Sequence, residues 1–174
     1  MGRSFLIPEY QKTYHGLYLL WRGIGAFCCR FPRYRWLYGT ASLSKLYDKR
    51  SVAIIQAALV NGADQVTPKN HFDFRLHPEI AAFAEQYTLR NHMSSFLQTI
   101  EPDSKDIPIL LKHYIKLNAN FHALGLDHNF AHTPGLLLSV HLPSAPAKVQ
   151  GKYLAGRLQS YLDYQAPDTE QPPG

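Results

Sequence analysis

Residues 120–142, "NFHALGLDHNFAHTPGLLLSVHL", decide the fold. The apolar segments "NFHALGLD" (120–127) and "GLLLSVHL" (135–142) have the length of strands, and a loop of about eight residues joins them. We therefore predict an antiparallel hairpin. Its core should include Leu124, Leu137 and Val140, with strand ends uncertain by a few residues.

The segments around this hairpin predict helices. In "IPILLKHYIKLN" (107–118) apolar residues recur with the 3.6-residue period, Asp106 is placed to cap the helix, and Pro108 is tolerated in its first turn. Apolar patterns and caps predict further helices at about 13–31, at 51–62 with Ser51 as a cap, at 78–100 in one or two pieces, and at 147–164. Strands are expected at 2–8 and 35–44, and a loop at 64–77.

This order of elements predicts an α/β fold in which helices flank a mixed sheet. We expect one domain over residues 1–164, followed by a disordered tail at 165–174. A content of 45% hydrophobic and 18% charged residues over 174 positions is ordinary for such a domain. No run of about 20 apolar residues is present, so no membrane-spanning helix is expected.

Basic residues are concentrated near the beginning of the chain. The net charge is +5, and nine of the 18 Lys and Arg residues lie in the first fifty positions, against only Glu9 and Asp48. Such an excess suits an acidic carrier protein, a phosphorylated cofactor, anionic lipid or nucleic acid, and charge alone cannot rank them. The adjacent Cys28 and Cys29 do not form a spaced disulfide framework, which favours a reducing compartment such as the cytoplasm.

The stretch "WRGIGA" (21–26) superficially suggests a phosphate loop. However, Gly23 and Gly25 fall inside the expected first helix rather than at its N-terminus, so we favour close helix packing. A better anion site is the turn "PEYQKTY" (8–14) before that helix, where free N–H groups and Lys12 could hold a phosphate. A polar turn with no ligand is an equal alternative.

A cluster of arginines follows the same helix. Arg30, Arg33 and Arg35, together with Tyr34 and Trp36, are candidates to dock an acidic acyl-carrier protein or an anionic membrane surface. A solvated basic surface is the alternative. No RNA-binding motif accompanies the cluster, so no nucleic-acid partner is expected.

Histidines provide weaker signals. His122 and Asp127 have the spacing of an acyltransferase base and acid, but one such match among nine histidines is unsurprising. His128 and His132 beside Asp127 lack the further ligands of a metal centre, so no metal site is expected. Ser94 and His92, two residues apart on a helix, do not face each other.

Four blocks carry a resemblance to a known family. They are "GRSFLIPEYQKTY" (2–14), "LLWRGIGAFCCRFPRYRWLYG" (19–39), "IEPDSKDIPILLKHYIKLN" (100–118) and the pair "LDHNF" (126–130) and "GLLLSVHLP" (135–143). In this order they resemble the C-terminal portion of hemolysin-like bacterial N-acyltransferases of the GNAT type. These proteins are related to ornithine-lipid N-acyltransferases, and some are fused to a lysophospholipid acyltransferase domain.

The resemblance implies an acetyltransferase-like fold and direct acyl transfer. The donor would be the phosphopantetheine thioester of acyl-carrier protein, or acyl-CoA, and the acceptor an amine such as ornithine in membrane-lipid synthesis; no tightly bound cofactor is implied. Arg3 and Ser4 match the family's strand-end block and would orient substrate and face the thioester. Tyr10, Gln11, Lys12 and Tyr14 lie in the turn that would bind the donor's phosphate. Such an enzyme would be cytoplasmic or peripheral on the inner membrane.

The chain also departs from the family pattern. The acid that precedes the Gly-Arg-Ser block would lie just before Met1, and the early strands of the fold before it. A family Ser-Ile-Ser-Asn appears as Ser42–Lys45, and a family Asn-x-x-Asp-Gly appears as His132–Gly135. We therefore expect the chain alone to be inactive, with the first half of the fold or a fused acyltransferase domain as its missing partner. The alternative is a non-catalytic remnant or docking module for acyl-carrier protein or an anionic membrane.

Overall fold

The computed structural model describes residues 7–10, 14–60, 66–79, 81–82, 89–154 and 156–165. Its contacts group into two compact units. Of the described residues, those up to 37 and those from 141 onward belong to unit 1, and those from 38 to 140 belong to unit 2. In chain order, the helices and strands are η1 (Pro8–Tyr10), α1 (Tyr14–Arg30), β1 (Trp36–Ser42), α2 (Lys49–Leu59), α4 (Leu89–Ile100), α5 (Ile109–Lys116), β2 (Asn120–Asp127), η2 (His128–Phe130), β3 (Thr133–His141), η3 (Leu142–Ser144), α6 (Ala147–Tyr153) and α7 (Leu158–Leu162).

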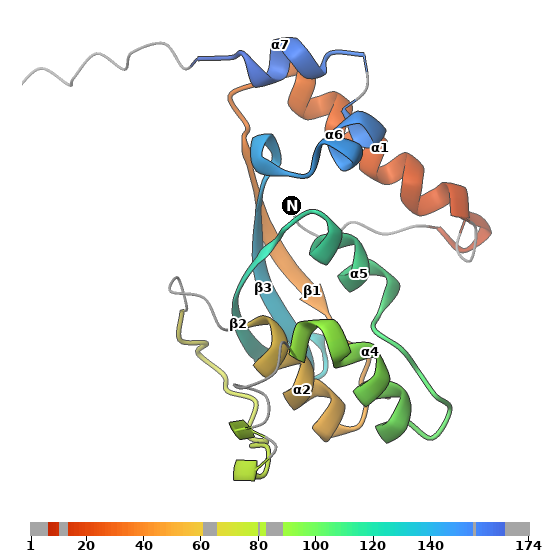
Figure 1. The fold of residues 1–174 in the computed structure, drawn as a ribbon, viewed down its shortest axis with the longest axis vertical. Helices are drawn as coiled ribbons and strands as arrows, with labels where there is room; N and C mark the ends of the chain where they lie inside the picture. Colours follow the sequence, from red (N-terminus) through yellow and green to blue (C-terminus); the bar gives the residue numbers. More distant parts are fainter. Residues whose placement is uncertain are drawn as a thin grey trace, which may run out of the picture. The chain divides into compact units, whose positions relative to one another are not determined.

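The predicted hairpin forms the sheet of unit 2. β2 pairs antiparallel with β3, Leu124 opposite Leu136, and η2 lies in the short connection that joins the strands. β3 is the central strand, between β1 and β2 (Figure 1). The predicted α/β class with flanking helices is therefore confirmed, but the sheet is a small antiparallel one rather than the mixed sheet predicted.

The buried face of β3 differs from the prediction by one residue. Leu124 and Val140 are buried as expected, but Leu137 is only half-buried. Leu136 and Leu138 take the core positions instead. Three consecutive leucines conceal which residues share the core face, since a shift of one residue moves every side chain of a strand to the other face.

The caps of two helices also differ from expectation. Asp48 caps α2, because its carboxylate accepts the backbone N–H of Arg50 at 2.8 Å. The predicted cap Ser51 lies within the helix and is fully buried. At α5 the N-cap is Pro108, which offers no side-chain acceptor, and Asp106 lies two residues before it. Helix α2 packs against α4 and against β2.

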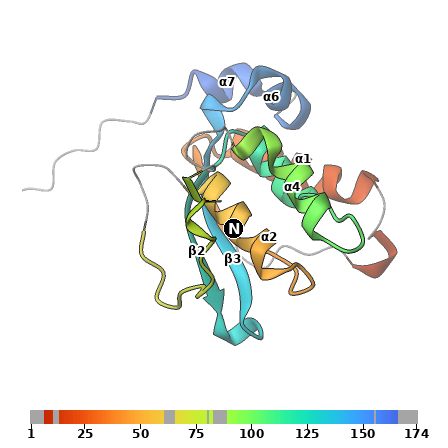
Figure 2. The same ribbon diagram turned by 60° about the horizontal axis from the view of Figure 1, so that its bottom comes forward.

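An irregular segment lies beside β2. The predicted loop is confirmed for residues 66–77, which form neither helix nor ladder strand. Yet Val66 N–H donates to His122 O, Leu126 N–H donates to Asn70 O, each at 3.0 Å, and His71 forms an isolated bridge with Gly125. Any Cβ on Gly125 would lie 2.9 Å from the Cβ of Pro68, so glycine permits this close approach. Figure 2 shows the segment, in yellow, running beside the strand.

Unit 1 is built around α1. The ring of Trp21 lies 5.9 Å from that of Tyr153, and α1 contacts both α6 and α7. The predicted closing helix is divided into these two helices, with Gly156 at a φ of +96° in the connection. Two of the glycines of α1 differ: Gly25 lies against the backbone carbonyl of Tyr153, whereas nothing lies near Gly23. The packing role predicted for both is seen only for Gly25.

These two glycines provide a matched pair of variants. Gly25→Ala should lower the free energy of unfolding by about 1–3 kcal/mol, because the added methyl group overlaps a backbone atom of α6. Gly23→Ala, at an exposed helical position, should raise it by about 0.5–1 kcal/mol. Urea unfolding followed by circular dichroism measures both values. Equal effects of the two substitutions would contradict the packing of α1 on α6.

Candidate functional site

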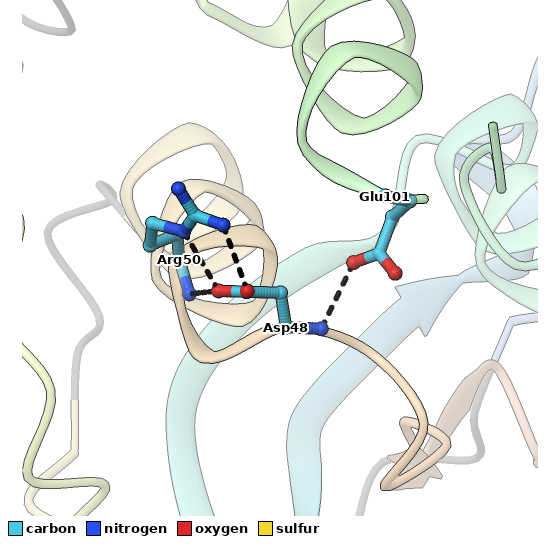
Figure 3. A network of polar contacts seen from close by, with 3 residues as sticks. All are labelled: Asp48, Arg50 and Glu101. Carbon is cyan, nitrogen blue, oxygen red and sulfur yellow. Dashed lines mark hydrogen bonds and ion pairs between the residues drawn. The ribbon is translucent and has the colours of Figure 1, made fainter. Parts of the chain in front are cut away.

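The turn between β1 and α2 is held by two carboxylates (Figure 3). Glu101, at the end of α4, is 3% exposed and accepts the backbone N–H of Asp48 at 2.9 Å. The Asp48 carboxylate accepts from the N–H, Nε and Nη2 of Arg50. These hydrogen bonds lower the pKa of Asp48 to about 2. The start of α2 therefore has its own charge partners and leaves no free N-terminal site for a ligand.

A second contact fixes the same turn to the beginning of α5. The Tyr47 hydroxyl donates to the carbonyl of Asp106 at 2.6 Å. The Asp106 carboxylate accepts from the Ser94 hydroxyl of α4 at 2.7 Å and from Lys112 of α5. Burial opposes ionisation of Asp106, but the hydrogen bonds from Lys112, Ser94 and a backbone N–H hold its pKa below the ordinary value. The end of the turn that leads into α2 is thus held by residues next to α4 and α5.

Between this turn and the sheet lies a cavity of about 310 Å³. Its walls come from three parts of unit 2: the β1–α2 turn and start of α2, the irregular segment, and the β2–β3 connection with its flanking strand ends. The lining residues are Ser44, Lys45, Tyr47, Lys49, Val52, Phe72, Asp73, Phe74, Leu126, His132 and Pro134. The cavity therefore combines apolar walls with a few polar groups, as small-molecule sites commonly do.

The lysines that line this cavity differ from the cations nearby, because they have no carboxylate partner among the described residues. Nearby carboxylates have cationic partners: Asp48 pairs with Arg50, Asp103 with Lys105, and Asp106 with Lys112. Lys45 and Lys49 form no ion pair with any described residue. Against these two lysines the described lining residues include one carboxylate, Asp73, so the cavity wall has an excess of positive charge.

The β2–β3 connection is strained where it reaches the cavity. Ala131 and His132 both have a φ of +55°, in the left-handed region that costs a non-glycine residue about 1–2 kcal/mol. The Asp127 carboxylate holds the preceding turn by accepting the N–H groups of Asn129 and Phe130. Strained backbone is concentrated at functional sites, and one of these two residues, His132, lines the cavity.

Unit 1 carries a different surface, which we call the aromatic–arginine surface: Phe27, Arg30, Phe31, Arg33 and Tyr34. The three rings are 51%, 40% and 41% exposed, in chain order, and ring centroids of Phe31 and Tyr34 lie 5.0 and 5.5 Å from that of Phe27. The guanidinium of Arg33 lies 4.9 Å from the Tyr34 ring, and that of Arg30 lies 5.9 Å from the Phe31 ring. An exposed aromatic group with stacked cations has the chemistry of an interfacial contact.

Arg35, the third arginine of the predicted docking group, has other contacts. Its guanidinium donates to the carbonyls of Tyr161, Leu162 and Tyr164, at 3.0 to 3.4 Å. It also lies 5.4 Å from the Tyr161 ring. These contacts satisfy the last carbonyls of α7, so Arg35 stabilises the fold of unit 1. Its docking role stays a prediction.

Of the adjacent cysteines in unit 1, Cys28 is buried and Cys29 is partly exposed. Burial raises the pKa of the Cys28 thiol to about 11, with a smaller effect from Cys29. Burial also raises the pKa of Cys29, whose thiol donates to the Leu154 carbonyl. Because nucleophilic cysteines need a lowered pKa, these thiols are packing residues at neutral pH.

The other predicted site residues are only partly described. Arg3, Ser4, Gln11 and Lys12 lie outside the described residues, and Tyr14 is described only as the first residue of α1. Tyr10 ends η1 and is 60% exposed. The described residues therefore do not test the predicted catalytic and donor-binding group, and those roles stay predictions.

The histidines do not form a metal centre in the described part of the chain. The rings of His128 and His132 lie 4.3 Å apart, but no group of three or more His, Cys, Asp or Glu side chains is suitably placed among those residues. His122, on β2, lies 2.7 Å from the hydroxyl of Ser139 on β3, so it forms a cross-strand contact.

Sequence reasoning missed the cavity. Lys49, Phe72, Asp73 and Phe74 were not candidates, because the segment that carries the last three was predicted only as a loop. A usable signal was present: the two stretches that depart from the family pattern, Ser42–Lys45 and His132–Gly135, both contribute residues to this cavity. They are about 90 residues apart in the chain, so only the fold shows that they converge.

No model of a known protein family, no curated protein and no solved structure matches this chain. The resemblance to GNAT-type acyltransferases therefore rests on the sequence blocks alone. Within the described residues, no helix has both the length and the apolar character needed to cross a bilayer.

The contact between Glu101 and Asp48 predicts a specific loss of stability. Glu101→Ala should lower the free energy of unfolding by about 1–3 kcal/mol, because it leaves the N–H of Asp48 without its acceptor. Glu101→Gln keeps an oxygen acceptor and should cost less. Denaturant unfolding measures both. Asp103→Ala, which removes an exposed carboxylate nearby, is the control and should stay within about 0.5 kcal/mol. An equal loss in this control would contradict a special role for Glu101.

The buried thiol predicts weaker stability in alkali. A pKa raised on folding gives Cys28 a stabilising contribution that is present below its ordinary pKa near 9 and is lost as pH rises through about 11. Tyr161, whose pKa burial raises to about 12, adds to this loss above pH 10. Urea unfolding at pH 7.5, 9 and 10.5 should show progressively lower stability, with a flatter dependence in Cys28→Ala. Stability that rises over this range would contradict the assignment.

Proposed function

We propose that this chain serves N-acyl transfer at the surface of an anionic membrane, and that the aromatic–arginine surface attaches it there. The observation that carries the membrane part is the exposed stack of Phe27, Phe31 and Tyr34 beside Arg30 and Arg33. Aromatic rings favour the headgroup level of a bilayer, and arginines there bind lipid phosphates. Peripheral attachment needs no spanning helix.

An acyl-carrier protein is the second candidate for this surface. Its acidic surface would pair with Arg30 and Arg33, but charge pairing alone gives no role to three exposed rings. The rings therefore favour a bilayer over an acidic protein. The two partners can be distinguished experimentally, because binding to a bilayer depends on the aromatic rings and charge pairing with an acidic protein does not.

The acyl-transfer part rests on the sequence blocks and on the agreement of a mixed α/β fold with the expected class. A finer GNAT-like arrangement belongs to the proposal. In it, Arg3 and Ser4 orient substrate and thioester, and the turn at Tyr10, Gln11, Lys12 and Tyr14 receives the phosphate of acyl-carrier protein or acyl-CoA. Alignment of amine and thioester can supply about 7–11 kcal/mol of barrier lowering, so transfer depends on a complete set of positioning groups. The alternative is a docking module that binds without transferring.

Cosedimentation with phosphatidylcholine vesicles, with and without phosphatidylglycerol, tests the attachment. The chain should bind only the anionic vesicles. Arg30→Ala with Arg33→Ala should weaken binding roughly 20- to 30-fold, because each basic residue near an anionic surface is worth about 1 kcal/mol. Binding should also fall as salt rises, since the Debye length shortens from about 10 Å at 0.1 M to about 3 Å at 1 M.

Two further variants make the result specific. Phe27→Ser with Phe31→Ser should also weaken vesicle binding, whereas Lys148→Ala, an exposed cation on α6, should leave it unchanged. Arg35 is left intact because its loss would free the end of α7. If the aromatic variant binds vesicles as well as the unchanged chain does, and purified acyl-carrier protein also binds, the partner of this surface is the carrier protein rather than the membrane.

Mass-spectrometric detection of N-acyl-ornithine, lost in Arg3→Ala, tests acyl transfer separately.

A further inference from the structure

We propose that the cavity of unit 2 binds a small phosphate monoester, with the phosphate between Lys45 and Lys49 and the apolar part of the ligand against Phe72 and Phe74. The volume of about 310 Å³ accommodates a ligand of this size. This inference goes beyond the proposed function and does not depend on it, because the cavity and the aromatic–arginine surface lie in different units.

The charge balance around the cavity selects an anion. Lys45 and Lys49 are exposed and have no carboxylate partner among the described residues, while the carboxylates of Asp48, Asp103 and Asp106 each have a cation of their own. Against these two ammonium groups the described lining residues hold one carboxylate, Asp73, so the lining has a net positive charge that favours an anionic ligand.

The number of acceptor oxygens favours a phosphate over a carboxylate. A phosphate monoester carries about −1.5 to −2 charges at pH 7 and three acceptor oxygens, which suits two ammonium donors. A carboxylate has only two acceptor oxygens and so offers fewer hydrogen bonds to these donors. The hydroxyl of Ser44 and the ring of His132, which also line the cavity, can donate further hydrogen bonds to phosphate oxygens.

The apolar part of the lining favours an ester rather than free phosphate. Phe72 and Phe74 are half-buried, their ring centroids lie 6.4 Å apart, and Val52, Leu126 and Pro134 continue the apolar wall. Free phosphate would leave this wall in contact with water. An aromatic or other flat apolar group attached to the phosphate would cover it.

Asp73 supplies a diagnostic, because it is the carboxylate among the described lining residues. Its charge opposes a phosphate but would attract a ligand amine. Asp73→Asn should therefore tighten binding of a purely anionic ligand and weaken binding of a ligand held through an ammonium group. The same substitution thus distinguishes the proposed ligand from a zwitterion.

Isothermal titration calorimetry of the whole chain with phenyl phosphate tests the proposal. Inorganic phosphate, benzoate and phenol serve as comparison ligands. Phenyl phosphate should bind at least fivefold more tightly than each of the three. Lys45→Ala and Lys49→Ala should each weaken it at least fivefold, their combination should abolish it, and Lys116→Ala, an exposed lysine at the end of α5, should leave it within twofold. Asp73→Asn should strengthen it.

Several results would overturn the proposal: no heat of binding at millimolar phenyl phosphate, equal binding of phenol, unchanged affinity in the double lysine variant, or weaker binding in Asp73→Asn. Circular dichroism establishes that each variant is folded. Binding of the double lysine variant to anionic vesicles separates the two sources of phosphate. Unchanged vesicle binding supports a soluble ester, and its loss would assign the cavity to a lipid headgroup.

Discussion

A single buried carboxylate organises unit 2. Glu101 directly follows α4 and accepts the backbone N–H of Asp48, the N-cap of α2, so one hydrogen bond joins the end of one helix to the start of another. A buried carboxylate is tolerated only with donors or positive charge nearby, and the start of α2 provides both a donor and the partial positive charge of its helix dipole. Tyr47 anchors the same turn to the carbonyl of Asp106. The positions of Lys45 and Lys49 follow from these two anchors.

The parts of the fold predicted correctly are those whose signal is local. The apolar period of α1, the hairpin of β2 and β3, and the loop at 66–77 each depend on neighbouring residues, and each is present. The errors lie where several neighbours look alike. Three leucines in a row concealed the core face of β3, and a serine three residues beyond Asp48 was mistaken for the cap of α2.

The cavity could not be predicted in the same way. Its lining residues come from three segments spread over Ser44 to Pro134, and no local pattern says that they converge. Long-range contacts also change the interpretation of Arg35. Its sequence context predicted an exposed docking group, but its guanidinium donates to carbonyls more than 120 residues away in the chain. Residue type indicates which chemistry a side chain can perform, but long-range packing determines whether that side chain is available for it.

The close approach of Pro68 to Gly125 has a consequence for solubility. An outer strand of a sheet offers a row of N–H and C=O groups to which another chain can add, and this is a common route to aggregation. Along β2 that row is taken up at His122, Gly125 and Leu126 by an irregular segment of the same molecule. Because the covering segment contains proline and forms no regular ladder, it is a poor template for a further strand. A glycine that admits a proline thereby protects this side of the sheet from strand addition by a second molecule.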